Sequence, residues 1–173
     1  MNIFYLHENP VTAARYHCDK HVVKMILEYA QLLSTAHHVL DGDDAPEGLY
    51  KVTHKNHPSA VWVRQSRDNY LWTFDLFVWL LKEYKERYNK EHKTSRLVSK
   101  LVQWPMNIPN TGFTQPPQCM PDEYKCDDPV TAYRNYYLGD KRYFARWKDG
   151  GAPLWYLTGL SESSTEYLFA IGR

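Results

Sequence analysis

A helical pattern runs through residues 19–35, which read DKHVVKMILEYAQLLST. Apolar residues recur in it at spacings of three and four, as on one face of an α-helix. These residues are Val22, Val23, Ile26, Leu27, Ala30 and Leu33. The pattern extends from about Thr12 to Val39, and the turn-forming and acidic residues of 41–46 end it. The sequence therefore predicts a long amphipathic helix near the start of the chain.

A second long helix is predicted over about 59–90, because Pro58 suits the first turn of a helix and apolar residues follow at helical spacing. Residues 70–81 are hydrophobic on more than one face, which favours a position at the centre of a bundle. Three shorter helices are expected over about 94–104, 128–138 and 140–148. Residues 2–6 alternate in polarity and predict at most one short strand, with no partner strand evident.

The expected fold is mainly α: a compact bundle of about five helices with one long proline-rich loop. The loop covers residues 105–127, and apolar side chains stand between its five prolines, so we expect it to pack onto the body of the protein. Residues 1–156 are predicted to form a single α-helical domain. Residues 157–173 are expected to be a C-terminal tail, docked or flexible.

The composition fits a protein that folds around a real core. Of the 173 residues 43% are hydrophobic, and 21 Lys and Arg nearly balance 20 Asp and Glu. This balance argues against binding of nucleic acid by bulk charge alone. Three cysteines are too few for a disulfide scaffold or a four-thiolate zinc site. No signal peptide and no membrane-spanning stretch is evident, so we expect no membrane partner and a cytoplasmic location.

The first predicted helix carries a polar row beside its apolar one. Its members are spaced by four and three residues and so share one face: His17, His21, Lys24, Glu28, Gln31 and Thr35. We interpret the row as a catalytic or ligand-binding wall, with Glu28 as general base and Lys24 as its electrostatic partner. Asp19 and Lys20 lie at its start. The alternative is a solvated helix face in which Lys24 and Glu28 form an ordinary ion pair.

His17 and His21 are four residues apart, a spacing at which two imidazoles can share one metal ion. A third ligand would have to come from Glu28, His54 or Asp122. Cys18 stands where the zinc-protease signature has a glutamate, so that signature is absent. The alternative is that the two histidines are hydrogen-bonded and bind no metal. We expect the protein to have no cofactor, and a bound metal ion is the alternative.

A basic loop, KVTHKNHP at residues 51–58, leads into the second predicted helix. Free backbone N–H groups at a helix N-terminus attract anions, and nearby cations strengthen the attraction. We therefore predict a site for phosphate or a nucleic-acid backbone, made of Lys51, His54, Lys55, His57 and Arg64. Trp62, about one turn inside the helix, is a candidate for stacking on a base. The alternative is a basic loop that caps the helix and binds nothing.

Aromatic and basic side chains alternate over residues 133–148. Such interleaving suits base stacking beside phosphate contacts, with Tyr136 and Trp147 as the stacking candidates. It equally suits helices that pack their aromatic side chains inward and leave the cations outside.

Asp122 lies at the end of the proline-rich loop, in the string MPDEYK at 120–125. A carboxylate on a loop held by prolines can be delivered into a cleft, so Asp122 is a candidate acid or base. A hollow shared by Asp122, His54 and the polar row would favour an enzyme. A convex row that faces solvent would favour a binding protein.

Five strings, taken together, resemble a family of phage-encoded proteins that are usually left as hypothetical. They are HCDKHVVKM (17–25), THKNHP (53–58), MPDEYK (120–125), AYRNYY (132–137) and FARW (144–147). The resemblance covers nearly everything from Met1 to about Tyr156. It implies a phage protein located in the host cytoplasm, and it implies little about biochemical activity.

A more distant resemblance is to bacterial and phage proteins classed with pyrimidine-dimer DNA glycosylases. It rests on DKHVVK (19–24) with Glu28 and QLL (31–33), and on HPSAVW (57–62), and so covers two helices. Those proteins are small and all-α, with an Arg- and Glu-containing active-site helix near the N-terminus. Their characterised members cut the glycosidic bond of a damaged pyrimidine through an imine and then nick the strand. The resemblance implies a carboxylate role for Glu28 or Asp19.

The sequence departs from those glycosylases at its start. They use the amino group of a threonine that is exposed when the initiator Met is removed. Asn2 is large enough that we expect Met1 to stay. Lys20 or Lys24 would then form the imine, or the site would act without a covalent step.

Together these observations predict a small phage-type enzyme that acts on DNA or nucleotides, as a DNA N-glycosylase-like activity. Its catalytic wall would consist of His17, Asp19, Lys20, His21, Lys24 and Glu28. An extruded base would stack on Trp62, Tyr136 or Trp147. One alternative is a non-enzymatic phage protein that binds a host or defence factor. Another is a metal-dependent hydrolase.

Overall fold

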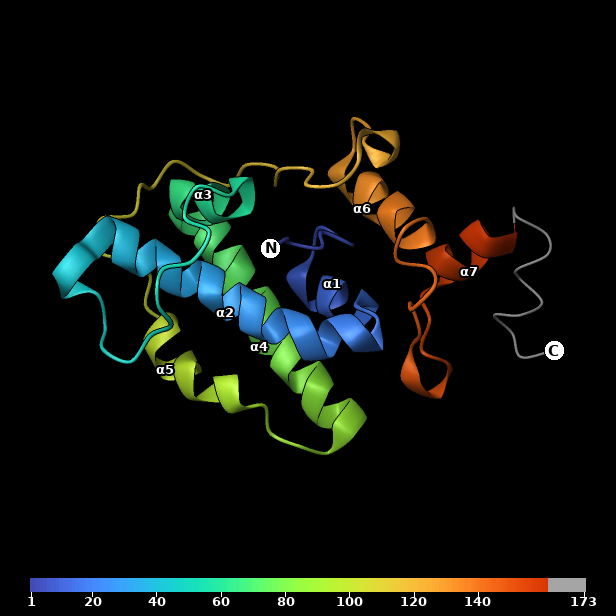
Figure 1. The fold of residues 1–173 in the computed structure, drawn as a ribbon, viewed down its shortest axis with the longest axis horizontal. Helices are drawn as coiled ribbons and strands as arrows, with labels where there is room; N and C mark the ends of the chain where they lie inside the picture. Colours follow the sequence, from blue (N-terminus) through green and yellow to red (C-terminus); the bar gives the residue numbers. More distant parts are fainter. Residues whose placement is uncertain (162–173) are drawn as a thin grey trace.

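The computed structural model describes residues 1–161 and places seven α-helices in them. These are α1 (Pro10–Tyr16), α2 (Asp19–Asp41), α3 (Pro58–Gln65), α4 (Arg67–Tyr88), α5 (Val98–Leu101), α6 (Pro129–Leu138) and α7 (Leu154–Ser161). Residues 1–161 contain no strand, so the expected mainly α fold is confirmed (Figure 1). The tail expected over 157–173 is helical as far as Ser161, and its remainder lies outside the described residues.

The first predicted helix is in fact two helices, α1 and α2, that meet at a corner. The Nδ1 atom of His17 lies 2.7 Å from the carbonyl oxygen of Ala13, the acceptor that an uninterrupted helix would offer to the amide of His17. The amide of Asp19 instead donates to the carbonyl of Arg146 at 2.8 Å. These partners explain the break, which apolar spacing alone does not reveal.

The second predicted helix also breaks, at Ser66 between α3 and α4. The backbone of Ser66 is extended, and its Oγ accepts from the amide of Asn69 at 3.2 Å as the N-cap of α4. The amide of Arg67 donates to the carbonyl of Pro109 at 2.8 Å. A residue of the proline-rich loop therefore helps to end α3.

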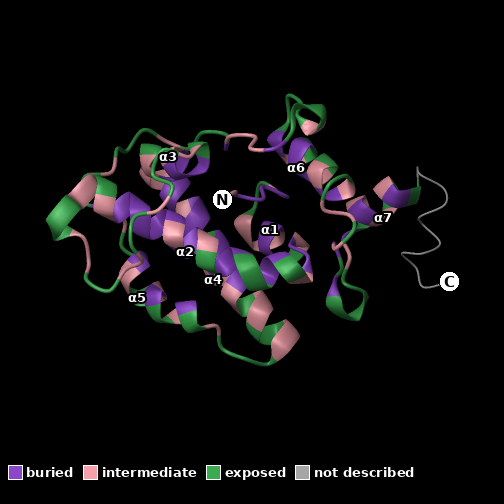
Figure 2. Cartoon of the chain, viewed as in Figure 1, coloured by how far each residue is buried: buried purple, intermediate pink, exposed green. Residues whose placement is uncertain are grey.

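Helix α4 occupies the centre of the bundle, as predicted. It packs against α1, α2 and α3, and Figure 1 shows α2 crossing it. Its buried residues point in several directions: Asn69, Tyr70, Trp72, Thr73, Phe74, Leu76, Phe77 and Leu80. Figure 2 shows buried positions along both α2 and α4, with exposed positions of α2 among them. Within residues 1–161, no helix has both the length and the apolar character needed to cross a membrane.

The proline-rich stretch between α5 and α6 packs onto the body, as expected. The side-chain amide of Asn69 binds Thr114 twice, since Nδ2 donates to Oγ1 and Oδ1 accepts from the backbone amide, both at 3.0 Å. Trp62 Nε1 donates to the Thr114 carbonyl at 3.0 Å. Near the other end of the stretch, Asp41 of α2 accepts from the amide of Met106 at 2.8 Å. These bonds hold a segment without regular structure along one side of the bundle (Figure 1).

The C-terminal part differs from the sequence-based expectation. The helix expected over 140–148 is absent: residues 139–144 form turns, and tertiary bonds to α1 and α2 hold 146–147, where Trp147 Nε1 donates to the Tyr16 carbonyl at 3.1 Å. The unexpected helix α7 packs against α6. Gly159 allows this approach, because a Cβ there would lie 2.6 Å from Leu138 Cδ1. The helix expected over 94–104 is a 3₁₀ turn followed by the single turn of α5.

Arg87 of α4 ties the corner between α1 and α2 to the bundle. Its Nη1 donates to the carbonyl of His17 at 2.9 Å and to Asp19 Oδ1 at 3.0 Å. Its Nη2 donates to the carbonyl of Arg15 at 3.1 Å and to Glu83 Oε2 at 2.9 Å. Because the guanidinium is largely buried, its removal would leave two carboxylates and two carbonyls without this donor.

The variant Arg87→Ala is expected to lower the free energy of unfolding by about 3 kcal/mol, because it breaks a largely buried ion pair from one side. Urea unfolding followed by circular dichroism measures the change. The control Glu86→Gln removes an exposed carboxylate from the same helix and should change stability by less than about 0.5 kcal/mol. Equal losses in the two variants would contradict the role assigned to Arg87.

Candidate functional site

His17, the first member of the predicted polar row, is part of the core. Its Nδ1 lies 2.7 Å from the Ala13 carbonyl oxygen and its Nε2 lies 2.7 Å from Tyr29 Oη. A carbonyl oxygen can only accept, so Nδ1 carries the ring proton and Nε2 accepts the hydroxyl proton of Tyr29. Burial, together with the nearby charge of Arg87, lowers the pKa of His17 to about 4. His17 is therefore a neutral residue with both ring nitrogens bonded.

His21 joins α2 to the N-terminal segment and to α6. Its ring stacks on Phe4 with 4.1 Å between centroids, and its Nδ1 lies 2.6 Å from Tyr137 Oη. The same Oη accepts from the amide of Cys18 at 3.3 Å. Burial, and after it the positive charges nearby, lower the pKa of His21 to about 2. Like His17, it is a neutral structural residue.

The ionic members of the row differ in exposure. The side chain of Lys24 is 63% exposed, and its Nζ lies 3.5 Å from Glu28 Oε1. Lys20 is also exposed, whereas Asp19 is held by Arg87 at 3.0 Å. The Glu28 side chain is 15% exposed. Glu28 is therefore the carboxylate of the row that is sheltered yet still reaches the surface.

Glu28 faces the start of the chain. Its Oε2 lies 3.7 Å from the α-amino nitrogen of Met1, whose side chain is 4% exposed. His57, the N-cap residue of α3, is close enough to both groups to respond to their charges. Burial lowers the pKa of His57, the Met1 amine and His54 lower it further, and Glu28 raises it. In a chain that begins at Met1, an amine, a carboxylate and an imidazole from three separate segments thus converge.

Asn2 holds Met1 in this position. Its Nδ2 donates to the carbonyl of Cys119 at 2.7 Å, and its Oδ1 accepts from the amide of Ile3 at 2.9 Å. The hydroxyl of Tyr133 on α6 donates to the same Oδ1 at 2.8 Å. The sequence does not indicate that Asn2 and the Met1 amine belong to the site, because the alternation over residues 2–6 indicates only extended backbone and carries no sign of these long-range partners.

The predicted anion loop is partly satisfied by its own side chains. His57 Nδ1 accepts from the amide of Ser59 at 3.1 Å, so one N–H group at the start of α3 is already bonded. Arg64 Nη1 donates to the carbonyl of Lys55 at 2.7 Å. The exposed members of the set are Lys51, His54 and Lys55. Phosphate binding by this loop stays a prediction.

The three candidate stacking residues lie in different surroundings. Trp62 and Trp147 are buried, and their Nε1 atoms bind the carbonyls of Thr114 and Tyr16. Neither indole presents an open face to a base in this conformation. Tyr136 is partly exposed, and its ring lies 6.3 Å from Phe4 between centroids. Of the three, Tyr136 alone has a partly accessible ring.

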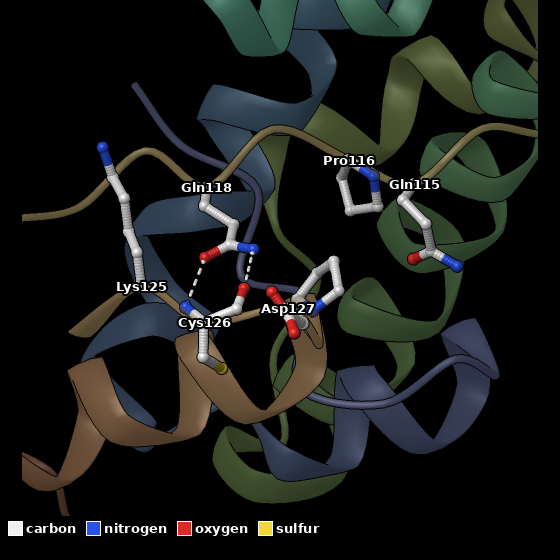
Figure 3. A pocket seen from close by; sticks show the side chains of 7 residues that line it. Gln115, Pro116, Gln118, Lys125, Cys126 and Asp127 are labelled. Atoms are coloured by element: carbon white, nitrogen blue, oxygen red, sulfur yellow. Dashed lines mark hydrogen bonds between the residues drawn. The ribbon is translucent and has the colours of Figure 1, made fainter. Parts of the chain in front are cut away.

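Asp122 is 95% exposed and pairs with Lys125 at 2.7 Å, a bond that lowers the pKa of Asp122. A shallow depression near the end of the loop (Figure 3) is lined by Gln115, Pro116, Gln118, Lys125, Cys126, Asp127 and Pro129. Gln118 shapes it by donating to the carbonyl of Cys126 at 2.6 Å and accepting from its amide at 3.2 Å. None of the site residues predicted from the sequence lines this depression, so it is not the hollow expected between the row, His54 and Asp122.

The proposed metal pair is bonded internally. The ring centroids of His17 and His21 are 6.4 Å apart, and hydrogen bonds occupy both nitrogens of His17 and the Nδ1 of His21. Across residues 1–161, no group of three His, Cys, Asp or Glu side chains is arranged to hold a metal ion. The alternative of two hydrogen-bonded histidines describes the observed arrangement.

Comparison of the chain with protein-family models, with curated proteins and with solved structures found no match. The convergence of Met1, Glu28 and His57 is therefore the structural basis from which a function can be argued.

Acidification is expected to destabilise the protein between about pH 6.5 and pH 4. The folded-state pKa of His17, about 4, lies below the value of 6.5 for the unfolded chain. As the pH falls the unfolded chain binds protons first, so the stabilisation is complete above about pH 6.5 and is lost toward pH 4. For His17 the loss is on the order of 3 kcal/mol. Urea unfolding at a series of pH values measures it.

In the variant His17→Gln, the slope of the free energy of unfolding against pH should fall by the contribution of one bound proton, roughly 1.4 kcal/mol per pH unit. The other histidines are present in both proteins, and His21, whose pKa His17 helps to lower, stays buried in both, so most of the difference comes from His17. Val63→Ala, a buried and non-ionisable control, should lower stability by a similar amount at every pH. An unaltered slope in His17→Gln would contradict the neutral state assigned to His17.

Proposed function

We propose that the protein is a DNA N-glycosylase-like enzyme that acts on a damaged or modified pyrimidine, with the α-amine of Met1 as nucleophile and Glu28 as its proton acceptor. The observation that carries the proposal is the 3.7 Å contact between the amine and the Glu28 carboxylate. An amine activated by an adjacent base is a standard arrangement for covalent catalysis through an imine. His57 is a third titratable group, on whose pKa the charges of both Met1 and Glu28 act.

The proposed reaction needs only the amine, the carboxylate and water. The neutral amine attacks C1′ of the sugar, the C1′–N bond breaks, and its electron pair leaves with the base, which takes up a proton from water. The amine then loses a proton to Glu28 and the sugar ring opens, which gives an imine. Water hydrolyses the imine to an aldehyde and restores the amine. Glu28 returns its proton to the sugar oxygen during ring opening.

The helix lysines are less suited to this role than Met1. Lys24 is 63% exposed and Lys20 lies with its ammonium 4.5 Å from the Phe144 ring centroid, so both are solvated surface groups. Met1 is sheltered, and Asn2 limits its movement through its bond to Cys119. A nucleophile held beside its base needs less reorganisation in the reaction. The proposal keeps the amine chemistry that the distant glycosylase resemblance implies and assigns it to Met1.

The test is borohydride trapping with duplex and single-stranded oligonucleotides that carry damaged or modified pyrimidines. Protein whose intact mass confirms an unblocked Met1 should give a covalent adduct, and mass spectrometry should locate it on the N-terminal peptide. A Gly-Ser extension ahead of Met1 should abolish the adduct because it displaces the amine. Lys24→Ala should still give the adduct on the N-terminal peptide at saturating oligonucleotide, because Lys24 is not the nucleophile. An adduct on Lys20 or Lys24, or the absence of both adduct and base release, would overturn the assignment of Met1.

The variant Glu28→Gln is expected to slow base release by at least about 100-fold, since general-base catalysis contributes factors of this size. Single-turnover measurement of released base gives the rate. Glu86→Gln, which removes an exposed carboxylate from α4, is the matched control and should release base at the wild-type rate. Comparable rates in Glu28→Gln and the control would exclude Glu28 as the base.

A further inference from the structure

Three lysines gather where the N-terminal end of α2 meets the segment after α6. Lys20 and Lys24 are one turn apart on α2, about 6 Å along the helix axis. Lys141 follows α6, and all three ammonium groups are close enough to the ring of His21 to act on it electrostatically. These three residues are called the basic patch below.

Lys20 and Lys141 of the basic patch make cation–π contacts with aromatic rings. The Nζ atoms of Lys20 and Lys141 lie 4.5 Å and 5.9 Å from the centroid of the same ring, that of Phe144. Lys141 Nζ also lies 4.6 Å from the ring centroid of Tyr136, the partly accessible aromatic residue. Such contacts hold the ammonium groups over the rings and leave their outer N–H groups for another partner.

The acidic residues nearest to the patch in the sequence bind elsewhere. Asp19 is held by Arg87 at 3.0 Å, and Asp140 Oδ1 accepts from the hydroxyl of Tyr124 at 2.9 Å. In the part of the chain that the structure describes, neither Lys20 nor Lys141 forms an ion pair with a carboxylate. The near-neutral net charge of the whole chain thus conceals a local excess of positive charge.

His21 lies next to the basic patch. The side chain is 4% exposed, and its Nδ1 lies 2.6 Å from Tyr137 Oη. The charges of Lys20, Lys24 and Lys141 all act on this ring and lower its pKa. The three lysines therefore lie around one buried, neutral imidazole, with no acidic side chain of residues 1–161 acting on that ring to offset their charge.

We propose that Lys20, Lys24 and Lys141 bind the phosphodiester backbone of a nucleic-acid strand, with the ring of Tyr136 beside it. The identity of this ligand rests on the proposed function. Lys24 also contacts Glu28 at 3.5 Å, so a strand held by the patch would continue toward the pair formed by Glu28 and Met1. The patch would position the substrate, and Glu28 and Met1 would carry out the chemistry.

The test is fluorescence anisotropy with labelled, undamaged oligonucleotides, single-stranded and duplex, at several salt concentrations. Each phosphate contact contributes about 0.7 to the slope of log K against log salt for a single strand and about 0.9 for a duplex. Lys20→Gln and Lys141→Gln should each reduce the slope by about this amount. Lys20→Arg and Lys141→Arg should give the wild-type slope, because arginine keeps the positive charge.

Lys82→Gln is the matched control. Lys82 is an exposed lysine on α4 whose Nζ lies 4.6 Å from the Trp79 ring centroid, so it has the same chemistry at a different place. Its slope should equal that of the wild type, and thermal unfolding should confirm that all variants are folded. Equal effects in Lys82→Gln and the patch variants, or wild-type slopes in both patch variants, would overturn the proposal.

The two proposals can fail separately. Undamaged DNA contains no target base, so anisotropy reports binding without reaction. Patch-dependent binding by a protein that releases no base would support this inference and refute the glycosylase activity. Base release by a protein whose DNA binding is unchanged in the patch variants would support the glycosylase activity and refute this inference.

Discussion

Two buried tyrosine hydroxyls hold the N-terminal segment between α2 and α6. Tyr29 Oη accepts from the amide of Phe4 at 3.2 Å, and Tyr133 Oη lies 2.8 Å from Asn2 Oδ1. The ring of Phe4 in turn stacks on His21. A buried polar group left without a partner costs about 1–3 kcal/mol, so these bonds strongly favour one position for residues 1–6. The placement of Met1 beside α2 follows from that position.

The same burial divides the polar row, which begins at His17 after α1 and continues along α2, into two kinds of residue. His17 and His21 lie on the inner side, where lack of water keeps them neutral and hydrogen-bonded to tyrosines. Lys24 and Glu28 lie farther along the helix at the surface, where the row meets Met1. A continuous catalytic wall does not form, because one face of a helix can pass from core to surface over a few turns. The chemistry we propose therefore depends on Glu28 and on a group outside the row.

The sequence predicted where the long helices lie more accurately than the residues at which they begin and end. Apolar spacing located α2 and α4 and placed α4 at the centre, because periodicity reports which face is buried. It missed the breaks at His17 and Ser66, since both depend on bonds to distant carbonyls, those of Arg146 and Pro109. It also missed α7, because Leu154 to Leu157 form a continuous apolar run without a helical period. Spacing likewise identified Glu28 as a site candidate but contained no sign of its partner.

The order of residues along the chain was sufficient for the fold class, for the central helix and for the shared face of the polar row, because each is a local property with a period of about 3.6 residues. Long-range packing settled which of those polar residues are neutral, which are charged, and which groups they meet. The bond between Asn2 and Cys119 joins positions 117 residues apart, and Glu28 meets Met1 only because that bond and the tyrosine hydroxyls bring the segment there. Such long-range contacts produce no periodic pattern in the sequence, because they arise from the free energy of burying polar groups with their partners.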